Sequence, residues 1–119
     1  MPDSLDAYRK TARRRKKTAR KEQERRRMKG RVVARRIAAD LRRAYDVDQI
    51  VLFGSIAGDE ALGPRSDLDL AVRGLDADAY YEAVARVQDI GGTFEVDLVR
   101  IESCPRSLRE RIQQEGRPL

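Results

Sequence analysis

Two short apolar segments, residues 49–53 and 67–72, constrain the fold of this chain more than any other feature. The first reads QIVLF and ends in Gly54-Ser55, and the second reads DLDLAV. Runs of this length that are rich in β-branched and aliphatic residues and bounded by glycine-rich turns are typical of strands. We therefore expect two strands joined by a loop, with acidic residues inside the second strand.

The acidic residues fall on one face of that second strand. Successive side chains of a strand point to opposite faces, so Leu68, Leu70 and Val72 would face a core. Asp67 and Asp69 would share the other face, about 6–7 Å apart along the strand. Two carboxylates at that distance repel each other unless a cation lies near them.

A third expected strand, residues 94–99, repeats the pattern with the sequence FEVDLV. Its apolar side chains alternate with Glu95 and Asp97, which face the other way. If this strand lies next to the second one, Asp97 can lie beside Asp67 and Asp69. Three carboxylates would then form a site suited to Mg²⁺, which prefers oxygen ligands and substrate phosphates.

The Gly54-Ser55 turn suits the phosphate side of such a site. Glycine permits a tight turn and a close approach of the backbone, and hydroxyl and backbone N–H groups can donate to phosphate. Each feature alone is more often a solvated sheet face or a simple turn. Their joint occurrence at the ends of correctly ordered strands favours a site.

The chain contains no histidine, which excludes Ser-His-Asp and Cys-His mechanisms and most zinc sites. A catalyst built from this sequence must use carboxylates, hydroxyls and cations, which again points to Mg²⁺.

The stretch LFGSIAGDEALGPRSDLDLAV resembles the signature of the DNA polymerase β-like nucleotidyltransferase superfamily. Within it, the chain is similar to the minimal nucleotidyltransferases (MNT proteins). Their pattern is an apolar strand, Gly-Ser, and then Asp-x-Asp on the next strand. Here eleven residues separate Ser55 from Asp67, one more than the commonest spacing. The resemblance covers roughly residues 31–116.

The resemblance implies a nucleotidyltransferase that transfers AMP, or another NMP, from an NTP such as ATP to a hydroxyl. Members are often antitoxins encoded beside HEPN-domain toxins, and some adenylylate a tyrosine of the toxin, so a HEPN partner is expected here. By position, Gly54 and Ser55 would contact the triphosphate. Asp67 and Asp69 would bind Mg²⁺, with two ions expected, and Asp97 would be the third catalytic carboxylate.

Two further residues, Arg65 and Ser66, flank the metal-binding strand and could touch phosphate. For Arg65, an ordinary surface position is the simpler interpretation.

The rest of the sequence predicts an α-β-β-α-β-α order and an α/β (α+β) fold, in which a short mixed sheet is flanked by helices. Apolar residues at helical spacing predict a helix over residues 31–45, extended toward the N-terminus by residues 4–29. Asp76 is expected to cap a helix that ends near residue 89, and a last helix is expected to end at Gly116. We divide the chain into a basic helical extension, residues 1–30, and a minimal nucleotidyltransferase domain, residues 31–119.

The net charge of +6 conceals two opposite halves. Residues 1–45 hold 18 Lys/Arg and 5 Asp/Glu, a net +13, whereas residues 46–119 hold 8 and 15, a net −7. Four interpretations of residues 9–36 stay open: a solvated helix, a nucleic-acid contact, a docking surface for an acidic partner, or a contact with the acidic half of another copy in a homo-oligomer. Charge alone does not rank the last three.

Three functions remain open at this point. The chain is a Mg²⁺-dependent protein adenylyltransferase that acts as an antitoxin, a non-catalytic antitoxin that neutralises its toxin by binding, or a nucleic-acid-binding protein that uses the basic extension. No apolar run approaches the roughly 20 residues needed to span a membrane. With one cysteine and no apolar N-terminal stretch, we expect a cytoplasmic protein.

Overall fold

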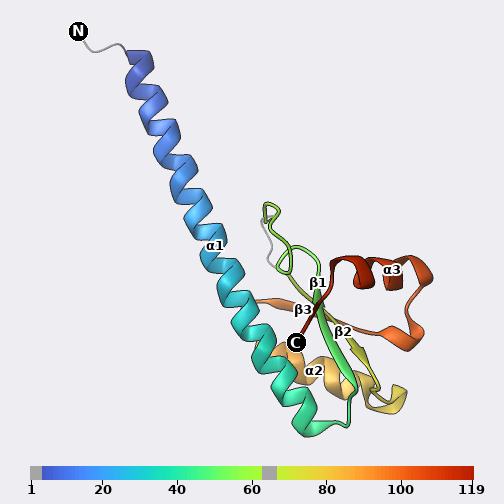
Figure 1. The fold of residues 1–119 in the computed structure, drawn as a ribbon. Coiled ribbons are helices and arrows are strands. Elements are labelled where there is room, and N and C mark those ends of the chain that lie inside the picture. Colours follow the sequence, from blue (N-terminus) through green and yellow to red (C-terminus); the bar gives the residue numbers. More distant parts are fainter. Residues whose placement is uncertain (1–3, 63–66) are drawn as a thin grey trace.

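The computed structural model describes residues 4–62 and 67–119 (Figure 1). Helices and strands alternate as the sequence predicts, with two short 3₁₀ turns and one further strand. In chain order the elements are α1 (Ser4–Ala44), β1 (Gln49–Phe53), β2 (Asp67–Arg73), η1 (Ala77–Ala79), α2 (Tyr80–Gly91), β3 (Glu95–Arg100), η2 (Ile101–Ser103), α3 (Arg106–Glu115) and β4 (Arg117–Pro118).

The four strands form one mixed sheet in the order β3-β2-β1-β4. β1 runs antiparallel to β2 and to β4, whereas β2 and β3 are parallel. The parallel pair requires a crossover connection, and α2 supplies it. The predicted mixed sheet flanked by helices is confirmed, and so is the expectation that the second and third strands are neighbours.

The two faces of the sheet bury different sets of side chains. On one face, α1 and α2 cover a large apolar core that includes Ile50, Leu52, Leu68, Leu70, Val72 and Leu98. On the other face, α3 covers a smaller cluster consisting of Val51, Phe53, Ala71, Ile101 and Ile112. The side chains of Asp67 and Asp69 belong to this second face, because their neighbours along the strand are in the large core.

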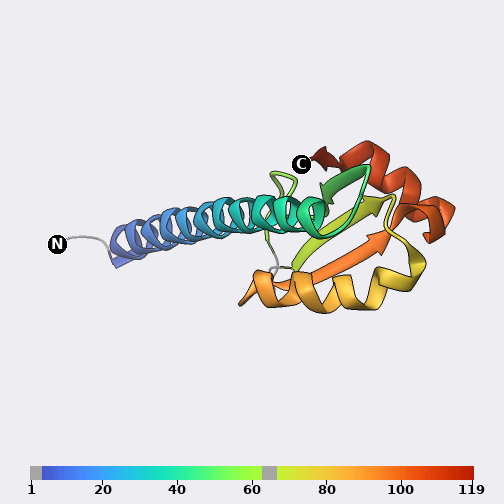
Figure 2. The ribbon, with the colours of Figure 1, turned by 90° about the horizontal axis from the view of Figure 1, so that it is seen from below.

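The helix α1 has two parts with different environments. Its C-terminal part packs on the core through Gly30, Ala34, Ile37, Ala38 and Leu41. Its N-terminal part stands clear of the sheet in both views (Figures 1 and 2). The radius of gyration is 18.4 Å, against about 14 Å for a compact chain of this length. We call residues 4–26 the arm.

The arm and the body share one uninterrupted helix across residue 30. The helical extension predicted over residues 4–29 is therefore confirmed, although the division into two units at residue 30 stays a proposal. Val33, Ile37 and Leu41 point toward the core as the spacing predicts, whereas Ala44 is exposed.

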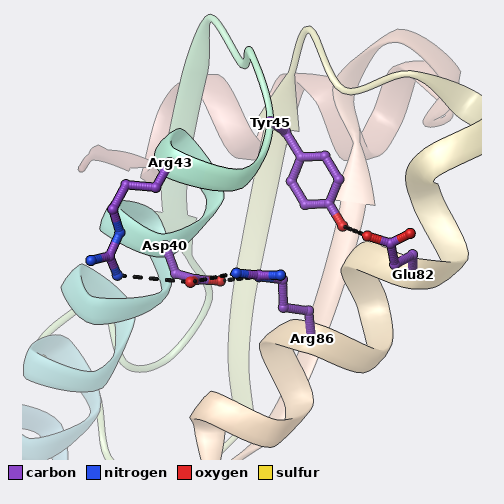
Figure 3. A network of polar contacts seen from close by, with 5 residues as sticks. All are labelled: Asp40, Arg43, Tyr45, Glu82 and Arg86. Carbon is purple, nitrogen blue, oxygen red and sulfur yellow. Dashed lines mark hydrogen bonds and ion pairs between the residues drawn. The ribbon is translucent and has the colours of Figure 1, made fainter.

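A polar network ties α1 to α2 beside the core (Figure 3). Asp40 lies between two arginines: Arg86 donates to it from α2, with an Nη2–Oδ1 distance of 3.0 Å, and Arg43 lies 3.8 Å away. The hydrogen bond from Arg86 holds the pKa of Asp40 below its usual value. Tyr45 donates its hydroxyl to Glu82 at 2.8 Å, so the C-terminal end of α1 is fixed against α2 at two points.

Two local predictions need correction. Asp76 makes no side-chain capping bond; instead its carbonyl accepts the N–H of Ala79 at 3.1 Å, which forms a 3₁₀ turn and delays the start of α2. The strand β4 was not predicted, because two residues that include a proline carry no periodicity. It pairs with β1 as an edge strand, the position that proline tolerates.

Within the residues that the structure describes, no helix is both long enough and apolar enough to cross a membrane.

The core face of α1 generates a stability prediction. Leu41 is 0% exposed, so Leu41→Ala should lower the free energy of unfolding by about 3 kcal/mol, through lost burial and the cavity that remains. Leu5→Ala is the matched control, since Leu5 lies in the arm and is 50% exposed; its effect should stay below about 0.5 kcal/mol. Urea denaturation of both variants measures the difference, and equal effects would contradict the division of α1 into a packed part and an arm.

Candidate active site

The strand β2 presents Asp67 and Asp69 on the face that α3 covers only in part. Both carboxylate residues are half-buried. They lie at the end of β2 where the chain enters it, and Asp69 is directly opposite Phe53, the last residue of β1. The end of β1 and the start of β2 therefore meet at one edge of the sheet, with Gly54 and Ser55 just beyond Phe53.

The neighbouring strand β3 adds two more carboxylates in register. Asp97 is the partner of Asp69 across the parallel pair, and Glu95 is the partner of Asp67. Parallel partners in register project to the same side of a sheet, so all four acidic residues share one face. The structure thus brings the three sequence-predicted carboxylates together on adjacent strands, with Asp97 and Glu95 exposed.

Two constraints require glycine at position 54. Its backbone has a φ of +77°, a conformation that residues with a side chain adopt rarely. In addition, a Cβ atom at this position would collide with the Asp69 carboxylate, whose Cγ would lie only 3.1 Å away. The Asp69 carboxylate occupies the space that a side chain at position 54 would need.

The pKa of Asp69 is raised above its ordinary value. Burial is the largest cause, followed by repulsion from Asp97 and then from Asp67, while Arg111 on α3 opposes the shift. The charges of Asp97 and Asp67 thus disfavour the ionised form of Asp69, and a bound cation would offset this repulsion.

The donor set fits Mg²⁺ in chemistry, since it consists of carboxylate oxygens only. In residues 4–62 and 67–119, no three acidic or cysteine side chains converge closely enough to count as a metal-binding cluster. A site for Mg²⁺ at Asp67, Asp69 and Asp97 accordingly stays a prediction.

A hollow of about 410 Å³ lies beside the carboxylates, around the β3 edge of the sheet. Phe53, Asp69, Asp97 and Arg111 are among its lining residues. The sequence did not single out Arg111, because it is one of several arginines on a helix whose position over the acidic face depends on the tertiary fold.

The loop after β1 begins with a tight turn in which Ala57 donates its N–H to the Gly54 carbonyl at 3.2 Å. Two arginines of α1 bind the backbone of this loop. Arg31 donates to the carbonyls of Ile56 and Ala57. Arg27 donates to the carbonyl of Ser55. Sequence reasoning missed both arginines, since they looked like two more charges in a basic run. Their spacing of four residues, on either side of the buried Gly30, was the available signal.

The remaining predicted phosphate contacts, Arg65 and Ser66, lie outside the residues that the structure describes.

Comparison with known proteins assigns the family. The profile described as "Polymerase beta, Nucleotidyltransferase" matches residues 35–119. The chain belongs to this nucleotidyltransferase family. The matched region contains the sheet, the Gly54-Ser55 turn and all three predicted carboxylates, while the arm lies outside it.

Solved structures of the same fold are minimal nucleotidyltransferases. A candidate minimal nucleotidyltransferase is 27% identical, with a TM-score of 0.59 over 75% of this chain and 91% of that one. The MNT antitoxin in complex with the tri-AMPylated HEPN toxin of Shewanella oneidensis is 25% identical, with a TM-score of 0.58 over 75% and 70%. A toxin–antitoxin complex with AMP-PNP is 25% identical, with a TM-score of 0.55 over 70% and 69%. No curated protein sequence matches the chain.

The expected family and fold are therefore confirmed, and the chain is a nucleotidyltransferase-fold protein that resembles MNT antitoxins.

The raised pKa of Asp69 predicts a pH-dependent gain in stability when its charge is removed. A carboxyl whose pKa is higher in the folded state contributes stability below its unfolded-state pKa and loses it as the pH rises through the folded-state pKa. In the absence of divalent cations, Asp69→Asn should raise the free energy of unfolding at pH 7 by about 1 kcal/mol. The gain should shrink at pH 3.

Urea denaturation at both pH values with EDTA present measures this gain. The exposed Asp78 provides a matched control, since Asp78→Asn should change stability little at either pH. A variant Asp69→Asn that is less stable than the wild type at pH 7 would show that the carboxylate is not under repulsion.

Proposed function

We propose that the protein is a Mg²⁺-dependent nucleotidyltransferase that transfers AMP, or another NMP, from an NTP to a hydroxyl group. One observation carries the proposal: Asp69 is held in the space left by Gly54 and lies in register with Asp97. A phosphate turn and a group of carboxylates thereby meet at one edge of the sheet, as transfer from a metal-bound triphosphate requires.

Each predicted site residue has a proposed role in this reaction. Gly54 and Ser55 would contact the triphosphate, with Arg65 and Ser66 as further candidates. Asp67 and Asp69 would hold Mg²⁺, which supplies charge neutralisation along the triphosphate when bound. Asp97 is more exposed, so it can either bind a second ion or accept the proton of the attacking hydroxyl.

In the transfer itself, the hydroxyl oxygen bonds to the α-phosphorus of the NTP. The bond from that phosphorus to its bridging oxygen breaks, and pyrophosphate leaves. The hydroxyl proton passes to a base, for which Asp97 is the candidate.

The acceptor that we favour is a tyrosine of a HEPN toxin, which would make the protein an antitoxin of the cytoplasm. The structural neighbours support this choice: one is a complex with an AMPylated HEPN toxin and another contains AMP-PNP. The open hollow beside Asp97 leaves the acceptor side of the site for a partner to cover.

Labelling of the toxin tests the proposal. With α-labelled ATP and Mg²⁺, the wild type should label the product of the neighbouring gene, which the proposal identifies as a HEPN toxin. Asp67→Asn combined with Asp69→Asn should reduce the labelling rate about 100-fold or more, because the metal ligands are lost. Asp76→Asn combined with Asp78→Asn is the control, since both residues are exposed and lie away from the site.

Labelling by the double variant at the wild-type rate would exclude these carboxylates as the metal site. Neutralisation of the toxin that persists without ATP and in the double variant would instead favour an antitoxin that acts by binding.

A second function is favoured by the arm. Residues 9–29 hold 13 Lys/Arg and 2 Asp/Glu, and almost all side chains of the arm are exposed. The helical stretch of residues 9–29 is about 30 Å long. It can follow a stretch of nucleic-acid backbone and neutralise phosphates. An acidic partner protein, or the acidic body of a second copy in a homo-oligomer, would use the same charges.

Salt dependence separates these uses of the arm. If the arm binds DNA or RNA, changing Arg13, Arg14, Lys16 and Lys17 to Gln should flatten the plot of log affinity against log salt by about 3.6, that is, about 0.9 for each of the four lost phosphate contacts. Fluorescence anisotropy with a labelled duplex measures the slope. Unchanged slopes, or an absence of binding by the wild type at low salt, would assign the arm to a protein partner or to solvent.

A further inference from the structure

Two arginines of α1 bind the loop that follows β1 from the side opposite the carboxylates. Arg31 donates to three successive carbonyls, with its Nε 3.1 Å from Ile56 O and its Nη2 3.2 Å from Ala57 O and 3.3 Å from Gly58 O. Arg27, one turn earlier, donates to the carbonyls of Ser55 and Glu60. Five carbonyls of residues 55–60 are thus bound by two side chains.

Binding these carbonyls also orients the N–H groups of the loop. In a trans peptide, the C=O of one residue and the N–H of the next point in opposite directions, and the described chain has no cis peptide bond. Carbonyls that point toward α1 at residues 55–58 therefore turn the N–H groups of residues 56–59 away from α1. The N–H of Ala57 donates to the Gly54 carbonyl, and Ile56 and Ala57 are buried. The N–H groups of Gly58 and Asp59, which make no hydrogen bond to a described residue, are therefore the ones that a ligand can reach.

N–H groups of successive residues that point the same way form an anion-binding surface. Carbonyl oxygens on that surface would repel a phosphate, and here the arginines hold them on the opposite side. The loop consequently presents the N–H groups of Gly58 and Asp59 while its backbone carbonyls are held on the α1 side.

The arrangement has a cost that points to a role beyond stability. The pKa of Arg31 is lowered by burial and by the charges of Arg117 and Arg27, so cations are kept close together. The Nε of Arg27 is buried without a hydrogen-bond partner among the described residues. Groups held under such cost are found more often at functional sites than elsewhere.

Gly30, between the two arginines on the helix, permits this close approach. A Cβ atom there would lie 3.1 Å from Cγ2 of Ile56 and 3.3 Å from Cδ2 of Leu68. Without that space, the helix could not lie against the loop closely enough for both guanidinium groups to reach its backbone.

We propose that Arg27 and Arg31 are positioning residues for the nucleotide: by binding the loop carbonyls, they turn its N–H groups toward the triphosphate. This inference rests on the proposed function. It adds that affinity for the triphosphate depends on the helix that carries the arm.

Binding of AMP-PNP with Mg²⁺ to the full chain tests the proposal. Arg31→Gln and Arg31→Lys should each weaken binding about tenfold, since the Gln amide has only two N–H donors and the Lys ammonium lacks the planar fork through which Nε and Nη2 of Arg31 reach separate carbonyls. Arg35→Gln is the matched control, because Arg35 is exposed one turn further along α1; it removes the same charge without removing a hydrogen bond to the loop. Isothermal titration calorimetry measures each affinity, and thermal melting confirms that each variant is folded.

Amide hydrogen exchange gives a second readout that does not need the nucleotide. In Arg31→Gln, exchange at Ala57, whose N–H donates to the Gly54 carbonyl, should accelerate about tenfold or more relative to Arg35→Gln, whereas exchange in α2 should not change. If Arg31→Gln fails to fold, Arg27→Gln replaces it, with the same expected directions.

The outcomes separate the two proposals. Unchanged exchange in a folded Arg31→Gln, or wild-type affinity in both Arg31 variants, overturns the positioning role. A wild type that does not bind AMP-PNP overturns the proposed function, and exchange then still decides whether Arg31 holds the loop.

Discussion

The contact between Asp69 and Gly54 is the constraint on which the candidate site depends. The carboxylate occupies the space where any other residue would carry a Cβ atom, and the positive φ of Gly54 turns the chain sharply out of β1 at that point. This contact fixes the Gly54-Ser55 turn relative to β2, and register then fixes Asp97 relative to Asp69. The cost is a carboxyl with a raised pKa, which a bound cation would relieve.

The rest of the fold supports that contact from two sides. The apolar core under α1 and α2 holds the sheet on which the carboxylates lie, and the pairs from Asp40 and Tyr45 to α2 fix α1 in place. The same helix also binds the loop that follows β1, through hydrogen bonds from Arg27 and Arg31 to its backbone carbonyls. One helix therefore contacts the core and the loop and continues as the arm, and the family match begins at residue 35, within its packed part.

Much of this organisation could be predicted from the sequence, because it depends on local periodicity. The alternation in DLDLAV and FEVDLV predicted which face each carboxylate takes, and helical spacing of apolar residues predicted the packed part of α1. The order of helices and strands along the chain was also predicted, whereas the strand order in the sheet came from the structure.

What the sequence did not predict depends on tertiary contacts. β4 is too short to carry a pattern, and Asp76 has the right residue type for a cap but binds through its carbonyl. The roles of Arg27, Arg31 and Arg111 were hidden for a different reason: in a chain with 26 Lys/Arg, composition cannot tell which of them meet the backbone or the carboxylates.

Paramagnetic relaxation by Mn²⁺ in the presence of AMP-PNP tests the central claim most directly, since Mn²⁺ binds oxygen ligands as Mg²⁺ does. The account predicts that substoichiometric Mn²⁺ broadens the backbone amide signals of residues 54–58, 67–69 and 95–97. Signals from the N-terminal turns of the arm, which stands clear of the sheet, should stay sharp. Broadening that spreads evenly over exposed carboxylates, or that spares Asp69 and Gly54, would contradict a metal–nucleotide site at this edge of the sheet.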